Sequence, residues 1–301
     1  VSAILAEKSG ADPIILVAPS DHAILGANAF QGAIETALQA ALGGKLVTFG
    51  ITPASAETGY GYILSPGAAT ATARCHDVEA FVEKPDAPTA EQYLKDGGYF
   101  WNSGIFLFRA SAFLAELELW QPEMAALCRQ AVDGGQGDLD FIRLDAPPFE
   151  AIEANSIDYA VMEKTKNAQM VAVDMGWSDV GSWDALWDIS NHDDAGNAIV
   201  GDVVLQNVTG SYIRSDHKLV AAIGIKDMIV VATDDAVLVA DRAEAQNVKN
   251  LVDALKDDAR SEYVSHTKVY RPWGWYQSLE IGERFQVKLI GVSPGAKISL
   301  Q

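Results

Sequence analysis

Two aspartates in this 301-residue sequence have a position suited to binding a metal ion. Asp21 follows the apolar run at 14–18 and precedes an alanine-rich helical pattern, and Asp179 also separates a strand pattern from a helical one. Ligands of open α/β sheets bind outside the carboxyl ends of the strands. Two carboxylates at two strand ends could converge on a hard cation such as Mg²⁺, which prefers oxygen ligands. A second interpretation stays open, in which Ser20 or Asp21 caps the following helix.

A second group of residues has the types that bind hydroxyl groups and phosphates. Glu83 ends a strand pattern and can accept hydrogen bonds from hydroxyls, and the ammonium group of Lys84 can meet a phosphate. The alternative is an exposed ion pair of little energetic consequence. Asn102 stands just before the apolar strand pattern at 104–108, where its amide either hydrogen-bonds a sugar or forms a turn.

The remaining candidates are less specific. Gly59 and Gly61 let the backbone approach a ligand closely, although their spacing alone favours a hairpin turn. Asp158, Glu163 and Lys164 lie on an expected helix, where most charges form a solvated face. The five histidines show no zinc-ligand spacing. The sequence also lacks a glycine-rich phosphate loop of the Walker or dinucleotide kind.

These side chains need a scaffold, which the hydrophobic pattern outlines. Helical patterns occur at 27–42 and 113–132, the latter interrupted by Pro122, and strand patterns occur at 14–18, 46–51, 78–82, 104–108 and 170–173. Apolar strands that alternate with helices predict an α/β domain with a mostly parallel sheet. The continuous apolar run at 14–18 is typical of a strand buried on both faces of that sheet.

The pattern changes near residue 193. Short runs of Val, Ile and Ala between turns, up to about residue 241, predict a small all-β module built as a coil of stacked strands. An amphipathic helix follows, with apolar residues at i, i+3, i+4 and i+7 from Val248. We therefore predict an α/β domain at 1–194, a β-module with its helix at 195–265, and a linker with the first strands of a further domain at 266–301.

Composition excludes some classes of partner. The 22 Lys and Arg residues against 41 Asp and Glu residues give a formal net charge of −19. Nucleic-acid binding requires a basic surface, so we expect no nucleic-acid partner. No apolar run approaches the roughly 18 residues of a membrane span, so we expect no membrane partner. Cys75 and Cys128 cannot form a disulfide framework and indicate reduced thiols in a cytoplasmic protein.

Seven motifs follow one another along the chain: APSDH at 18–22, ETGYGYI at 57–63, FVEKP at 81–85, WNSG at 101–104, SIDYAVMEK at 156–164, GWSDVGSW at 176–183 and RPWG at 271–274. Taken in this order, they resemble the motifs of bacterial mannose-1-phosphate guanylyltransferases in the long form that carries a mannose-6-phosphate isomerase domain. The resemblance covers essentially the whole chain.

The resemblance implies a Rossmann-like nucleotidyltransferase domain with a mixed sheet, followed by a small left-handed β-helix-like module. It implies the reaction of GTP with α-D-mannose 1-phosphate, giving GDP-mannose and pyrophosphate, with Mg²⁺ as cofactor. By similarity, Asp21 and Asp179 would hold the metal, and Lys84 would meet the sugar phosphate. The substrate-binding residues that it implies are Gly59, Gly61, Glu83, Asn102, Asp158, Glu163 and Lys164.

The sequence also departs from the family's pattern. The family's glycine-rich basic loop should precede Val1, and the metal-binding histidines of its isomerase domain should follow Gln301. We therefore expect a piece of a longer chain that makes no GDP-mannose by itself, which a pyrophosphate-release assay tests. Two alternatives stay open: a transferase that uses UTP or dTTP with glucose 1-phosphate, and a catalytically silent regulator that binds sugar nucleotides. The oligomeric state is open too, with a homodimer as one option.

Overall fold

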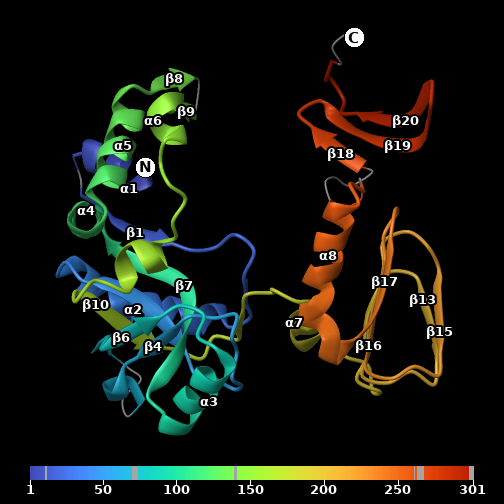
Figure 1. Cartoon of the computed structure of the whole chain (residues 1–301), viewed down its shortest axis with the longest axis horizontal. Helices are drawn as coiled ribbons and strands as arrows, with labels where there is room; N and C mark the ends of the chain where they lie inside the picture. The colour runs from blue at the N-terminus through green and yellow to red at the C-terminus, as the bar shows by residue number, and fades with distance from the viewer. Residues whose placement is uncertain (11, 70–73, 139–140, 261, 263–267, 298–301) are drawn as a thin grey trace. The chain divides into compact units, whose positions relative to one another are not determined.

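The computed structural model describes residues 1–10, 12–69, 74–138, 141–260, 262 and 268–297. The chain divides into two compact units, Val1–Asp179 and Val180–Gln301 (Figure 1). The domain limits predicted at 194/195 and 265/266 stay predictions, and residues 266–267 and 298–301 of the last predicted part lie outside the described residues. Within the described ranges, no helix combines the length and the apolar character that crossing a bilayer requires.

The first unit is built on a seven-stranded sheet in the order β5-β10-β3-β7-β4-β6, with β1 also paired to β7. Its strands are β1 (Ile14–Val17), β3 (Leu46–Ile51), β4 (Tyr62–Leu64), β5 (His76–Asp77), β6 (Ala80–Val82), β7 (Tyr99–Arg109) and β10 (Ala168–Ala172). Among the described strands of this sheet, β3 and β10 alone pair in parallel, and the central strand β7 runs antiparallel to β1, β3 and β4. The mixed sheet is confirmed, and the mostly parallel sheet expected from the strand–helix alternation is wrong. That alternation shows where strands occur but not the direction in which β7 enters the sheet.

Strand β1 is less buried than its apolar sequence predicts. Leu16 is 43% exposed and Val17 is 38% exposed, so the prediction of a strand buried on both faces is wrong. The reason is its place in the sheet, since β1 pairs with β7 alone among the described strands.

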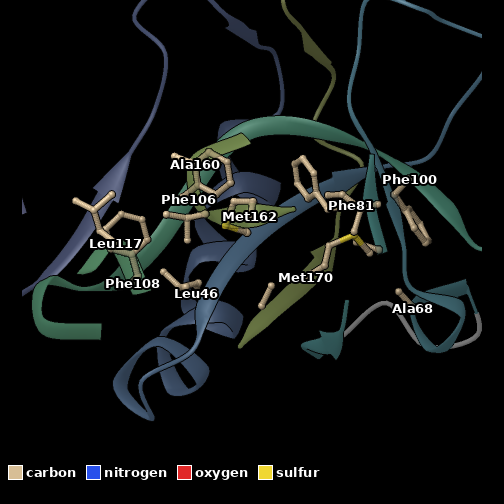
Figure 2. Close-up of a cluster of buried hydrophobic side chains, with 14 of the residues drawn as sticks. Leu46, Ala68, Phe81, Phe100, Phe106, Phe108, Leu117, Ala160, Met162 and Met170 are labelled. Carbon is tan, nitrogen blue, oxygen red and sulfur yellow. The ribbon is translucent and has the colours of Figure 1, made fainter. Parts of the chain in front are cut away.

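Helices cover both faces of this sheet. They are α1 (Ser2–Lys8), α2 (Ala27–Leu42), α3 (Ala87–Asp96), α4 (Ala110–Trp120), α5 (Pro122–Asp133), α6 (Ala146–Glu150), the 3₁₀ turn η1 (Pro66–Ala69) and the π-helical turn η2 (Asp158–Met162). On one face, α2 packs on β3, β7 and β10. On the other face, Leu46, Phe106 and Met170 meet side chains from α4, α5 and η2 (Figure 2). Two further antiparallel ladders join β2 (Ala23–Ile24) to β11 (Trp177–Ser178) and β8 (Gln136–Asp138) to β9 (Phe141–Arg143).

Two helix boundaries bear on the sequence predictions. Helix α2 spans the predicted residues 27–42 and buries Ala33, Ala37 and Ala41, whose small side chains allow a close approach to the sheet. Its N-cap is Gly26, so the alternative in which Ser20 or Asp21 caps this helix is wrong. The predicted interruption at Pro122 is confirmed, because this proline begins α5, where its missing N–H leaves no unpaired donor.

The second unit contains the predicted β-module. Its elements are α7 (Trp183–Ile189), β12 (Ala198–Val200), β13 (Val203–Gln206), β14 (Tyr212–Ser215), β15 (Val220–Ile223), β16 (Met228–Ala232), β17 (Val237–Asp241), η3 (Arg242–Asn247) and α8 (Val248–Asp257). Parallel ladders join β12, β14 and β16, and also β13 and β15. Ala198, Tyr212 and Ile229 stand in register on adjacent strands and are all buried. The coil of stacked short strands is thereby confirmed, and its left-handedness stays a prediction.

The last described residues form a three-stranded antiparallel sheet. It contains β18 (Lys268–Arg271), β19 (Gly274–Gly282) and β20 (Phe285–Val292), in that order. The presence of strands in the segment 266–301 is therefore confirmed over its described part.

Candidate active site

Glu83 and Lys84 lie at the end of β6 and form an ion pair. Lys84 Nζ is 3.1 Å from Glu83 Oε1, and the side chains are 58% exposed for Lys84 and 10% exposed for Glu83. Lys84 is therefore exposed but Glu83 is largely buried, whereas the alternative interpretation expected an exposed ion pair. Lys84 has a φ of 49°, a left-handed conformation that costs a residue with a Cβ about 1 kcal/mol. Such strain concentrates at functional sites.

The electrostatics of this pair follow from burial. Burial raises the pKa of Glu83, and the hydrogen bond to Lys84 opposes that rise. The same contact raises the pKa of Lys84, since it favours the ammonium form. The charge on Lys84 is thus retained at neutral pH, next to a carboxylate that is costly to keep ionised.

Asn102 is hydrogen-bonded to the π-helical turn η2. It lies inside β7, only 9% exposed, rather than before the strand as the sequence suggested. Its Nδ2 donates to Asp158 Oδ1 at 3.0 Å, and its Oδ1 accepts from Thr48 Oγ1 at 3.1 Å. The amide is therefore oriented by partners on both of its sides.

Asp158 opens η2, in which the N–H of Glu163 donates to the carbonyl of Asp158 at 2.9 Å. This i→i+5 turn is of the kind often found at functional sites. Burial raises the pKa of Asp158. Glu163 is exposed, and its Oε1 accepts from the backbone N–H of Glu83 at 3.0 Å, which ties η2 to the end of β6. Lys164 is exposed, and no described contact links its side chain to this cluster.

In the turn at Gly59 and Gly61, Gly61 lies against Glu83 and Gly59 does not. A Cβ on Gly61 would collide with Glu83 Oε2, whereas a Cβ on Gly59 would meet no atom within 4 Å. The carbonyl of Gly61 accepts from the N–H of Asn102 at 2.8 Å. Gly61 therefore allows β4, β6 and β7 to bring their polar groups together.

Asp179 is linked to this turn by Tyr60, whose hydroxyl donates to Asp179 Oδ1 at 3.0 Å. The β2–β11 ladder pairs Ser178 with Ala23, and Asp179 and His22 are the chain neighbours of these two paired residues. The exposed Asp21 precedes His22, so the ladder brings the loop that carries Asp21 alongside Asp179.

The donor chemistry of the two aspartates fits a hard divalent cation. In the described part of the chain, no three His, Cys, Asp or Glu side chains gather into a group that could hold a metal. Mg²⁺ does not require such a cage, because it keeps several waters and binds through one or two carboxylates plus substrate phosphates. The carboxylates of the exposed Asp21 and of Asp179, which Tyr60 orients, are of the type that this mode of binding uses.

Sequence reasoning missed the aromatic residues that hold this region. The ring of Tyr60 lies edge-on to Trp101 and Trp177, with centroids 5.1 and 5.3 Å away. Trp177 Nε1 donates to His22 Nδ1 at 3.2 Å, which fixes the His22 ring beside the Asp21 loop. Their position in the sequence could have identified them, since each of these aromatic residues stands within two residues of a predicted site residue.

The raised pKa of Glu83 predicts a pH-dependent stability. The folded state retains the proton on the Glu83 carboxyl to higher pH than the unfolded state does. The stabilisation that this bound proton provides is fully present below the ordinary pKa of 4.5, and it is lost as the pH rises through the pKa of the folded state. Glu83→Gln cannot ionise, so its melting temperature relative to wild type should increase from about pH 4 to about pH 8. Thermal unfolding of both proteins across this range measures the difference, and the exposed Glu91→Gln is the matched control. A difference that does not change with pH would contradict the assignment.

Family models match the chain in three successive parts. Residues 2–196 match the nucleotidyl transferase model, residues 201–255 match the MannoseP isomerase/GMP-like beta-helix domain, and residues 258–301 match the mannose-6-phosphate isomerase C-terminal model. The first of these regions includes every residue of the candidate site.

Curated relatives align along essentially the whole chain. The chain is 52% identical over 301 residues to a xanthan biosynthesis protein of Xanthomonas campestris pv. campestris (strain B100), covering 100% of this chain and 63% of that protein. It is 49% identical over 299 residues to a mannose-1-phosphate guanylyltransferase of Salmonella typhimurium (strain LT2), covering 98% and 62%. The corresponding enzyme of Escherichia coli (strain K12) is 47% identical, with 96% and 61% covered. The chain thus spans less than two thirds of the length of these relatives.

Solved structures agree on the fold. A mannose-1-phosphate geranyltransferase from Thermus thermophilus aligns with a TM-score of 0.73 at 30% identity, covering 84% of this chain and 72% of that one. A mannose-6-phosphate isomerase from Helicobacter pylori aligns with a TM-score of 0.53 at 34% identity, covering 59% and 68%.

Proposed function

The chain belongs to the nucleotidyltransferase family, in the branch of the mannose-1-phosphate guanylyltransferases, and from that premise we propose that the full-length protein makes GDP-mannose and pyrophosphate from GTP and α-D-mannose 1-phosphate. The reaction is an in-line attack of a sugar-phosphate oxygen on the α-phosphorus of GTP. No covalent intermediate with the protein forms, so catalysis consists of positioning and charge neutralisation.

The observation that supports this proposal is that two groups of candidate residues lie next to each other. Tyr60 and Gly61 are adjacent, and they join two groups of side chains with different chemistry. Tyr60 holds Asp179 on one side. Gly61 leaves room for Glu83 on the other side. A carboxylate suited to a metal–phosphate complex thus neighbours groups suited to a phosphorylated sugar.

Each side chain has a role that its chemistry supports. The carboxylates of Glu83 and Asp158 accept hydrogen bonds from mannose hydroxyls, with Asn102 between them and Gly61 giving clearance. Lys84 pairs with the phosphate of mannose 1-phosphate. Gly59, Glu163 and Lys164 border the same site, and we assign them to substrate binding with no specific contact.

Nucleotidyltransferases of this kind generally use a divalent metal ion, and we propose Mg²⁺. When bound, it neutralises phosphate charge during the transfer. Asp21 and Asp179 are the residues that would hold it, and Tyr60 keeps the carboxylate of Asp179 oriented.

The test is turnover by the full-length protein with GTP and mannose 1-phosphate, followed by pyrophosphate release and by detection of GDP-mannose. UTP, dTTP and glucose 1-phosphate are the competing substrates. The match to mannose-specific relatives favours GTP and mannose 1-phosphate. Faster turnover with UTP or dTTP would overturn the substrate assignment, and the absence of any turnover would favour the regulator.

We also propose a biosynthetic role, a cellular location and an oligomeric state for the protein. A relative that acts in xanthan biosynthesis supports a role in supplying a polysaccharide precursor. We place the protein in the cytoplasm, where GTP is available. The homodimer stays a prediction, which sedimentation of the full-length protein tests.

The two glycines of the turn give a matched pair of variants. Gly61→Ala displaces the Glu83 carboxylate and should raise the KM for mannose 1-phosphate about tenfold, since a hydrogen bond to a charged group is lost. Gly59→Ala places its methyl group in open space and leaves Glu83 in place, so it should raise this KM clearly less than Gly61→Ala does. Initial rates at varied mannose 1-phosphate compare the two variants. Equal effects of both changes would contradict the proposed place of Glu83.

A further inference from the structure

The strand pairing of β3 with β7 is irregular at the candidate site. Thr48 pairs with Phe106, but two residues further along β3, Gly50 pairs with Asn102. Between these two pairs β7 has more residues than β3, so residues 103–105 form a bulge in β7. Gly104 has a φ of 69°, which glycine adopts at little cost. Bulges of this kind occur next to active sites, where they redirect a side chain.

Thr48 joins the two sides of this bulge. Its Oγ1 lies 3.1 Å from Asn102 Oδ1 and 3.1 Å from the carbonyl oxygen of Ile105, so its single hydroxyl hydrogen is shared between them. The Thr48 side chain is fully buried and stands in an otherwise apolar strand. A buried hydroxyl in such a strand has to be hydrogen-bonded, and here one acceptor lies in the bulge and the other on Asn102, directly before it.

The orientation of the Asn102 amide follows from these contacts. Its Oδ1 accepts from Thr48 and from the N–H of Gly104, which is 3.2 Å away. With the oxygen occupied by two donors, the Nδ2 group is directed to Asp158. A flipped amide would place N–H groups against the Gly104 N–H and an oxygen against the Asp158 carboxylate.

We propose that Thr48 is a positioning residue for sugar-phosphate binding, which acts by fixing the amide of Asn102 across the β7 bulge. The inference rests on the proposed function, since Asn102 is there a ligand of the sugar. Thr48 has no exposed surface and touches no substrate itself. Its effect should therefore appear in the affinity for mannose 1-phosphate and leave the affinity for GTP unchanged.

Two substitutions at Thr48 separate positioning from packing. In the full-length protein, Thr48→Val keeps the volume and removes the hydroxyl, so the KM for mannose 1-phosphate should rise about tenfold and the KM for GTP should stay within about twofold. Thr48→Ser keeps the hydroxyl and loses a buried methyl group. It should keep the wild-type KM for both substrates while its melting temperature falls. A purely structural role predicts the opposite order, with Ser more impaired than Val.

A double variant tests the route of the effect. Asn102→Ala removes the amide that Thr48 positions, so Thr48→Val added to Asn102→Ala should cause no further rise in KM. A wild-type KM in Thr48→Val, additive effects in the double variant, or a raised KM in Thr48→Ser would each overturn the inference. The Ser result decides the question if the Val variant does not fold. A wild-type protein that makes no GDP-mannose would instead overturn the proposed function itself.

Discussion

Replacing Asp179 with asparagine in the full-length protein is expected to lower GDP-mannose formation by about 10³-fold, because charge stabilisation in the transition state depends on the metal that this carboxylate would hold. The asparagine side chain has the same shape, and its oxygen can still accept from Tyr60, which lies 3.0 Å from Asp179 Oδ1 in the wild type. Only the negative charge is lost. Turnover at saturating GTP and mannose 1-phosphate measures the effect, and magnesium-dependent thermal stabilisation in the presence of GTP gives a second readout.

Asp174→Asn is the matched control for this prediction. Asp174 is an exposed aspartate earlier in the same segment, and it belongs to no part of the proposed site. Its replacement should leave turnover and magnesium-dependent stabilisation close to the wild-type values. If Asp179→Asn kept both properties, the metal would have to bind elsewhere. If it lost turnover but kept the stabilisation, Asp179 would act in another role.

Local pattern was sufficient for most of the elements. The alanine-rich pattern predicted α2 at its observed bounds of Ala27–Leu42, and the strand pattern at 46–51 predicted β3. Such patterns depend on which side of one element is apolar, which the sequence shows directly. Strand direction depends on pairing between distant segments. For that reason the antiparallel entry of β7 and the exposed position of β1 could not be predicted.

The polar residues of the candidate site could be predicted, but the residues that orient their side chains could not. Glu83, Asn102 and Asp158 were identified by residue type and motif, and the structure brings them together. Thr48 was not identified, because its hydrogen-bond partner Asn102 lies 54 residues away. Likewise, Tyr60 is 119 residues from Asp179. Long-range contacts of this kind leave no periodic signal in one sequence.

The backbone of the turn at Gly59 and Gly61 connects the residues proposed to bind the metal with those proposed to bind the sugar. A change at Tyr60 would act on Asp179 and, through the adjacent Gly61, on Glu83. The sheet contributes in the same way, since a Cβ on Gly104 in the β7 bulge would lie 3.6 Å from Pro19 and 3.7 Å from His22, in the loop that carries Asp21. The residues proposed to bind the metal and those proposed to bind the sugar are thus positioned by the same few strands.

Replacing Lys84 with methionine is expected to lower kcat/KM for mannose 1-phosphate by about 100-fold, because the only cation that contacts the described Glu83–Asp158 cluster would be lost. Methionine keeps much of the apolar stem of lysine. The loss also leaves Glu83, whose side chain is only 10% exposed, without its ion-pair partner, and an unpaired buried carboxylate is costly. The KM for GTP should change much less than the KM for mannose 1-phosphate. Initial rates with each substrate varied in turn separate these effects.

Lys95→Met is the matched control, since the Lys95 side chain is 69% exposed and makes only a long i,i+4 pair with Glu91 on α3. It should leave both KM values unchanged. Lys84→Arg keeps the charge but replaces a compact ammonium group with a planar guanidinium group, so it should recover part of the lost kcat/KM. If Lys84→Met impaired GTP and mannose 1-phosphate equally, Lys84 would act on the nucleotide phosphates. If its only effect were a lower melting temperature, the Glu83–Lys84 pair would serve the fold, and a different cation would have to meet the sugar phosphate.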